Sequence, residues 1–338
     1  MYEEFYGFSG KPFQLSPDAR FFYNSSGHNR AMAYLRYGLR QREGFIVITG
    51  GIGTGKTMLV SNLFQELHGE DVVAAQLVST QIDEDEVLRM INAAFGLEHE
   101  GLSKAALLRN LEAFLRARRT EGRRVLLVVD EAQNLPPRTI EELRMLSNYQ
   151  QDGQALLQSF LLGQPELKKT LQQQGMEQVR QRIIAGYHLR PLDRQELQAY
   201  VEHRLAIVGW NGNPRLTDSA FDALFEGTGG VPRRLNNLCD RLLLFGALED
   251  LHVLDGELVR SVIAEMADEI GTNDNADVTG LPESAAMMSD TDAGDLAARL
   301  EALEAEVRGL KASLGKTRRL VKQAIMLHMD EDDDELEH

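Results

Sequence analysis

The chain of 338 residues has little that would place it outside the cell or in a membrane. Its single cysteine, Cys239, excludes an intramolecular disulfide framework and suits a reducing compartment. Apolar runs such as Val125–Val129 are far shorter than the roughly 18–20 residues that a membrane span needs. The first residues lack the basic and apolar stretches of a signal peptide. We therefore expect a cytoplasmic protein with no membrane span of its own.

The chain also lacks an excess of basic residues, since its formal net charge is −16. Residues 273–338 contain 16 acidic and 7 basic side chains, a net charge of −9, which leaves −7 for the rest of the chain. Non-specific binding to nucleic acid usually needs a basic face, so the composition disfavours nucleic acid as a partner. Hydrophobic residues make up 43% and charged residues 26%, as in ordinary soluble globular proteins.

The most informative stretch is a strand that runs into a glycine-rich turn and then into a helix. The strand is Phe45–Thr49, and the helical spacing is given by Met58, Leu59, Leu63 and Leu67. Between them, Gly50-x4-Gly55-Lys56-Thr57 fits the phosphate-binding-loop pattern. An ordinary glycine-rich turn is the alternative, but strand, loop and helix all agree with the phosphate loop.

The loop predicts a cradle for the phosphates of a nucleotide. Its glycines let backbone N–H groups turn inward, beside the positive end of the helix dipole. Lys56 would reach the β- and γ-phosphates, and the Thr57 hydroxyl would be a ligand of Mg²⁺. The expected nucleotide-contacting residues are Gly50, Gly51, Ile52, Gly53, Thr54, Gly55, Lys56, Thr57 and Met58.

An acidic pair follows a second apolar strand. Val125–Val129 is typical of a buried parallel strand, and it ends in Asp130 and Glu131. The carboxyl ends of strands are where an α/β sheet presents its site. We expect Asp130 to hold Mg²⁺ with Thr57, and Glu131 to act as the general base that activates water. Helix capping is the alternative role, which the phosphate loop 74 residues before Asp130 makes less attractive.

Further polar residues follow the next strand. Gln164, after a strand at Leu156–Leu162, would lie between the two sites just named and contact the γ-phosphate or the water. Arg180 and Arg182 precede a short strand expected near Tyr187–Leu189. Either arginine, and preferably Arg182, is a candidate finger that neutralises transition-state charge in a neighbouring subunit. Solvated surface arginines are the ordinary alternative.

From Leu192 the pattern changes to helices only, which predicts a small helical lid at residues 192–270. Thr217 and Asp255 are expected to cap two of these helices. Pro232 opens another helix in its first turn, followed by Arg233. The helix dipole disfavours a cation at a helix start, so Arg233 suggests an anionic partner and is expected to fold back on the phosphates.

These features resemble an AAA+ ATPase. Three sequence strings are similar to those of the ExeA/GspA-type secretion ATPases, and most of all to the branch associated with exosortase (PEP-CTERM) and exopolysaccharide loci. The strings are Tyr6-Gly7-Phe8 with the aromatic stretch after it, Asp130-Glu131-Ala132-Gln133-Asn134-Leu135, and Gly163-Gln164-Pro165-Glu166-Leu167.

The resemblance covers about residues 1–270. It implies ATP and Mg²⁺ as cofactors and a five-stranded parallel α/β sheet in the order 5-1-4-3-2. It also implies sensor roles for Gln164 and Arg233, and a homo-oligomer, ring or dimer, whose arginine finger acts in trans. The task that it implies is envelope secretion or the export of surface polymers.

One departure concerns the envelope. ExeA/GspA proteins carry a membrane span and a periplasmic peptidoglycan-binding part, and neither is seen here. We therefore expect recruitment to the inner membrane through a membrane-anchored secretion or polysaccharide-export partner.

The nucleotide-binding domain is expected at residues 31–191. Outside this domain and the lid, the chain divides into four further segments. Residues 1–30 read as an aromatic clasp on the domain that follows, which would border the adenine pocket or make no ligand contact. Residues 271–295 read as an acidic flexible linker and 329–338 as an acidic disordered tail. A heptad seam predicts a coiled coil at 296–328, with a lone amphipathic helix as the alternative; it comprises Leu296, Leu300, Leu303, Val307, Leu310, Leu314 and Val321.

A basic cluster before the strand that ends in the acidic pair also needs an explanation. It comprises Arg116, Arg118, Arg119, Arg123 and Arg124. The simplest explanation is that these cations interact favourably with the C-terminal end of a helix. The alternative is that they form a docking patch for an acidic partner, for nucleic acid or for the chain's own tail. Two alternative functions remain. One is a DNA-dependent regulator of the transposition-accessory type, which the arginine cluster weakly favours and the net acidity disfavours. The other is a nucleotide-gated scaffold that works through the coiled coil, and Glu131 argues against it because a pure binder needs no general base.

Overall fold

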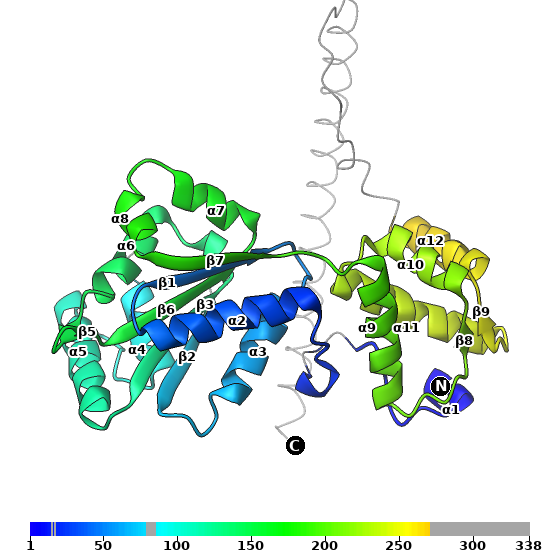
Figure 1. The fold of residues 1–338 in the computed structure, drawn as a ribbon, viewed down its shortest axis with the longest axis horizontal. Helices are drawn as coiled ribbons and strands as arrows, with labels where there is room; N and C mark the ends of the chain where they lie inside the picture. The colour runs from blue at the N-terminus through cyan, green and yellow to red at the C-terminus, as the bar shows by residue number, and fades with distance from the viewer. Residues whose placement is uncertain (15, 17, 79–85, 271–338) are drawn as a thin grey trace, which may run out of the picture. The chain divides into compact units, whose positions relative to one another are not determined.

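The computed structural model describes residues 1–14, 16, 18–78 and 86–270, and its centre is a parallel sheet (Figure 1). The strands are β1 (Phe45–Gly50), β2 (Val72–Val78), β3 (Arg124–Asp130), β6 (Leu157–Gly163) and β7 (Ile183–Leu189). Their order is β2-β3-β6-β1-β7. Counted along the chain this is the expected order 5-1-4-3-2, so the predicted α/β fold is confirmed. The last strand begins several residues earlier than the sequence suggested.

Both faces of the sheet are covered because its strands are apolar on both sides. In β1, Ile46 and Ile48 pack with α2 and α3, whereas Phe45 and Val47 pack on the opposite face with the helices between β2 and β7. These helices are α2 (Ser26–Gln41), α3 (Lys56–Glu66), α4 (Val87–Ala94), α5 (Lys104–Thr120), α6 (Pro137–Leu146), α7 (Pro165–Gln172) and α8 (Glu177–Gln181). A short turn, η2 (Ala132–Asn134), follows β3, and β4 (Gln150–Gln151) and β5 (Gln154–Ala155) pair as a small hairpin before β6.

The lid is built from four helices: α9 (Arg194–Ile207), α10 (Asp218–Thr228), α11 (Pro232–Leu248) and α12 (Gly256–Ile270). Thr217 and Asp255 cap α10 and α12 as predicted, with hydrogen bonds from the backbone N–H groups of Ala220 (3.2 Å) and Leu258 (3.0 Å). One correction is needed, because the lid is not purely helical. Two short strands, β8 (Arg215–Leu216) and β9 (Val253–Leu254), pair in parallel beside these caps.

The aromatic clasp packs mainly on the lid, and its turn at Ala19–Phe21 also contacts α3 of the α/β domain that follows it in the chain. It contains α1 (Tyr2–Tyr6) and a short turn, η1 (Ala19–Phe21). Buried aromatic side chains of the clasp join one hydrophobic core with lid helices. The Tyr2 hydroxyl donates a hydrogen bond of 2.5 Å to Asp240, and the Tyr6 hydroxyl one of 3.0 Å to the Leu251 carbonyl.

The predicted linker, coiled coil and acidic tail lie outside the described residues. Within the part of the chain that the structure describes, no helix combines the length and the apolar character needed to cross a bilayer.

Candidate functional site

The glycine-rich loop between β1 and α3 has the backbone conformation that its sequence predicts. Gly53 and Gly55 have φ values of +76° and +98°, in the region that favours glycine. A Cβ on Gly55 would lie 2.6 Å from His28 Nε2, and one on Gly53 would lie 2.6 Å from the Cβ of Arg233. Both glycines are therefore required by backbone conformation and by close neighbours.

Lys56 begins α3 and points back over the loop. Its ammonium group donates hydrogen bonds to the carbonyl oxygens of Gly50 (2.9 Å) and Gly51 (3.0 Å). Burial lowers the pKa of Lys56, and the negative charges of Glu131 and Asp130 act in the opposite direction. The loop therefore presents a partly desolvated cation next to two carboxylates.

Asp130 ends β3 beside the start of α3. Thr57 Oγ1 donates a hydrogen bond of 3.1 Å to Asp130 Oδ2, and the Glu131 N–H donates one of 2.9 Å to Oδ1. Asp130 is 2% exposed, and burial raises its pKa, although these two hydrogen bonds lower it. A hydroxyl and a carboxylate side by side are the protein ligands that Mg²⁺ takes next to a phosphate loop. The residues present thus fit this ion.

Glu131 is placed by a left-handed backbone and by two glutamines. Its φ is +52°, which is unusual for a residue other than glycine. Gln133 Nε2 donates a hydrogen bond of 2.6 Å to Glu131 Oε2, and Gln133 Oε1 accepts one of 2.9 Å from the Gln164 N–H. Gln164 Nε2 lies 3.4 Å from the same Glu131 oxygen. Sequence reasoning did not assign Gln133 a role, and the only signal was its place in the string after the acidic pair.

One open cleft of about 1180 Å³ brings most of the expected residues together. From the α/β domain it is lined by Ile52, Gly53, Gly55, Lys56, Thr57, Met58, Glu131 and Gln164. From the lid it is lined by Tyr200, Arg204, Pro232, Arg233 and Asn236. The backbone N–H of Arg233 donates a hydrogen bond of 3.2 Å to the Gly53 carbonyl, and its side chain makes no hydrogen bond or ion pair with the described residues. The lid thus touches the loop directly.

Arg180 and Arg182 are not part of this cleft. Arg182 donates a hydrogen bond of 2.8 Å to Asn148, and its carbonyl oxygen accepts one from the N–H of Phe45, the first residue of β1. Arg180 is bonded to the Leu171 carbonyl and to Glu177. Both arginines lie where β1 and β7 begin, whereas the cleft lies where these strands end.

A smaller apolar pocket of about 350 Å³ lies next to the loop, between the clasp and the lid. It is lined by Phe21, Phe22, Tyr23, His28, Gly55, Met58, Leu192, Tyr200, Arg204 and Pro232. Burial lowers the pKa of His28 to about 4, and its Nδ1 lies 2.8 Å from Ser25 Oγ. Sequence reasoning left a position beside the adenine pocket as one of two alternatives for the clasp, and it did not single out His28, Tyr200 or Arg204.

Comparisons with known proteins agree with this geometry. Residues 39–171 match the family described as AAA domain. General secretion pathway protein A of Aeromonas hydrophila is 38% identical over 260 residues, which are 76% of this chain and 47% of that protein. The chain therefore spans about half the length of this relative.

Solved structures show the same fold at low sequence identity. Cdc6p from Pyrobaculum aerophilum matches with a TM-score of 0.61 and 17% identity, over 80% of this chain and 74% of that one. The Aeropyrum pernix ORC2 protein, in its ADPNP–ADP complexes, matches with a TM-score of 0.56 and 17% identity, over 74% and 72% of the two chains. The domain match and the relative support an ATPase, whereas the solved structures show the fold alone.

Proposed function

Because these matches support an AAA+ ATPase related to General secretion pathway protein A, we propose that the chain hydrolyses ATP at Lys56 and uses the reaction to move its lid. The observation that carries the proposal is the single cleft formed by Lys56, Thr57, Glu131, Gln164 and Arg233. Nucleotide phosphates would replace the Gly50 and Gly51 carbonyl oxygens as the hydrogen-bond acceptors of Lys56, and would form an ion pair with its ammonium group.

Glu131 acts as the general base in this proposal. The hydrogen bond from Gln133 leaves the second oxygen of Glu131 to accept a proton from the attacking water. Gln164 lies within reach of the same carboxylate, where it orients the water or the γ-phosphate. The carboxylate is thus pre-positioned before the substrate arrives, which reduces the cost of ordering it in the transition state.

We propose that the metal is Mg²⁺ and that Thr57 and Asp130 are its protein ligands. When bound, this ion offsets the negative charge that develops on the phosphates. Burial raises the pKa of Asp130 even though the nearby Lys56 ammonium group lowers it. A bound metal ion would add to the effect of Lys56 and lower that pKa further.

The lid is the element that we propose to respond to turnover. Arg233 has no other partner among the described side chains and lines the cleft, so an added phosphate is the anion that it would bind. Its backbone already contacts Gly53, which ties the start of α11 to the loop. The adenine ring would occupy the apolar pocket next to Gly55, between Met58, Leu192 and Pro232.

We propose that the finger arginine comes from a second copy of the chain. Arg182 lies where β7 begins and so cannot reach the cleft of its own chain, where β1 ends. A ring or dimer brings it to a neighbouring site, and Arg180 is the less favoured choice because its guanidinium is already bonded to Glu177.

The task that we propose is envelope export, in partnership with a membrane-anchored component. The secretion relative carries this proposal. The finer assignment, to an exosortase or exopolysaccharide locus, rests on the sequence strings alone. Neighbouring genes for these systems would support it, and a neighbouring transposase would favour the DNA-dependent regulator instead.

Phosphate release from ATP by the full chain tests the proposal. Wild-type protein should turn over ATP with magnesium and stop when the metal is chelated. Lys56→Ala should abolish turnover, whereas Lys168→Ala, on the exposed surface of α7, should leave it unchanged. Equal release by wild type and Lys56→Ala would overturn the assignment.

A further inference from the structure

A second polar pocket lies at the edge of the sheet opposite the cleft. It has a volume of about 460 Å³ and is lined by Leu39, Arg42, Val72, Arg119, Arg123, Arg124, Val125, Leu126, Gln154, Ala155, Leu156 and Gln158. We call it the arginine pocket, after Arg42, Arg119, Arg123 and Arg124. It lies where β2, β3 and β6 begin, whereas the cleft lies where these strands end.

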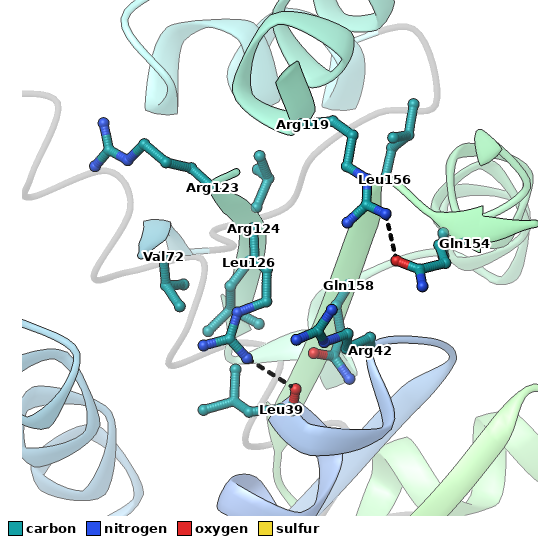
Figure 2. A pocket seen from close by; sticks show the side chains of 12 residues that line it. Leu39, Arg42, Val72, Arg119, Arg123, Arg124, Leu126, Gln154, Leu156 and Gln158 are labelled. Carbon is teal, nitrogen blue, oxygen red and sulfur yellow. Dashed lines mark hydrogen bonds between the residues drawn. The ribbon is translucent and has the colours of Figure 1, made fainter. Parts of the chain in front are cut away.

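The four arginines come from three parts of the chain and line one pocket. Arg119 is in the last turn of α5, Arg123 and Arg124 lie at the start of β3, and Arg42 follows α2. In Figure 2 the side chain of Arg42 overlaps that of Gln158, with Arg119 above them and Arg124 to their left, and Arg123 extends away from the other three arginines. No acidic side chain is among the described residues that line the pocket. The positive charges therefore have no anion between them.

Structural roles account for only part of this arrangement. Arg124 donates a hydrogen bond of 3.1 Å to the Leu39 carbonyl near the end of α2, and Arg119 donates one of 2.5 Å to Gln154 of the β5 strand. Arg42 and Arg123 make no side-chain hydrogen bond or ion pair within the described ranges. Helix capping thus explains Arg124, and Gln154 binds Arg119. No such role in the described part of the fold accounts for the guanidinium groups of Arg42 and Arg123.

Arg42 also occupies a costly backbone position. It ends α2 with a φ of +62°, the conformation that glycine usually supplies at a helix end. An arginine there bears backbone strain, and its side chain makes no hydrogen bond or ion pair with the described residues. Its guanidinium lies on the pocket, so the strain points to a ligand.

Guanidinium groups from three directions suit a phosphate better than a flat carboxylate. Arginine forks bind phosphate oxygens bidentately, and a tetrahedral group accepts donors from several sides at once. The floor of the pocket, formed by Leu39, Val72 and Leu126, is apolar. The chain as a whole is acidic, which disfavours a long polyanion.

We propose that the arginine pocket binds the phosphate group of a small ligand, at a site separate from the nucleotide cleft. Strand β3 connects the two sites directly, because Arg124 at one end lines the pocket and Asp130 at the other lies beside Thr57. Occupancy of the pocket is therefore placed to act on the cleft through one rigid element.

Calorimetric titration of pyrophosphate into the full-length Lys56→Ala variant tests this site without any need for turnover. The substitution removes the competing phosphate site of the loop; wild type saturated with ADP serves the same purpose if the variant does not fold. We expect binding that weakens at least about tenfold in Arg42→Gln/Arg123→Gln on the same background. The matched pair Arg89→Gln/Arg260→Gln, exposed and outside the pocket, removes the same charge and should change affinity less than about twofold.

Absence of pyrophosphate binding overturns the proposal, and so does equal weakening by the two pairs. Two further probes distinguish other sources of phosphate. Binding to phosphatidylglycerol vesicles or to duplex DNA that depends on Arg42 and Arg123, without any binding of pyrophosphate, would assign the surface to a membrane or to nucleic acid and overturn the small-ligand site. Failure of ATP hydrolysis leaves the result of this titration unaffected.

Discussion

The side-chain amide of Gln133 donates a hydrogen bond of 2.6 Å to Glu131 Oε2 and accepts one of 2.9 Å from the backbone of Gln164. Gln133 therefore joins the end of β3 to the end of β6 and fixes one oxygen of the proposed base. It is a positioning residue, because it acts on the reaction through Glu131.

Gln133→Ala should lower kcat and leave KM nearly unchanged. Loss of a hydrogen bond to a charged group costs about 1.5–3 kcal/mol, which corresponds to roughly ten- to a hundredfold in rate. Steady-state kinetics measure the two constants separately. A rise in KM with kcat intact would instead mean that Gln133 supports nucleotide binding.

Gly53→Ala should weaken nucleotide binding by more than about tenfold. A Cβ there would lie 2.6 Å from the Cβ of Arg233, so the lid has to move away from the loop. Gly122→Ala is the matched control, because Gly122 has the same φ of +76° but nothing within 4 Å of the added Cβ. Fluorescence titration with a labelled ATP analogue measures both; equal affinities would contradict the lid contact.

His28 should make the protein less stable as the pH falls from 6.5 towards 4. Burial lowers the pKa of folded His28 to about 4, whereas the unfolded chain binds the proton near pH 6.5. The unfolded state therefore gains protons first, and the free energy of unfolding falls by about 2 kcal/mol between pH 7 and pH 5 from this group. Urea unfolding at both pH values should show a smaller drop in His28→Gln than in wild type. Identical drops would show that folded His28 titrates normally.

Arg204→Met should destabilise the clasp and the lid together. Arg204 is 7% exposed, donates a hydrogen bond of 2.6 Å to the Pro12 carbonyl and one of 2.8 Å to the Tyr200 hydroxyl, and lies 4.8 Å from the centre of the Phe21 ring. Loss of these bonds should lower the free energy of unfolding by about 2–4 kcal/mol. Denaturant unfolding measures it, with Arg260→Met on the exposed face of α12 as the control. A stable Arg204→Met protein with a protease-resistant clasp would contradict this role.

The sheet and the loop could be predicted because their signals are local. Apolar runs such as Val125–Val129 and the glycine spacing from Gly50 to Gly55 determine strand, turn and helix within a few residues. The resemblance then supplied the strand order, which composition and periodicity do not contain.

The remaining features depend on contacts between distant residues. Nothing near Tyr2 or Tyr6 reveals that they pack on the lid, some 240 residues later in the chain. A buried arginine such as Arg204 runs against the usual exposure of its type, so a sequence pattern treats it as surface. The pairing of β8 with β9 involves only two residues in each strand, which is too short for any periodicity.

The most direct test of the account compares ATP binding with ATP turnover in Glu131→Gln. The substitution removes the base but keeps the shape and the hydrogen-bonding oxygen that Gln133 contacts. The account predicts wild-type affinity for ATP together with a loss of at least about a hundredfold in phosphate release. Phosphate release at the wild-type rate would contradict it.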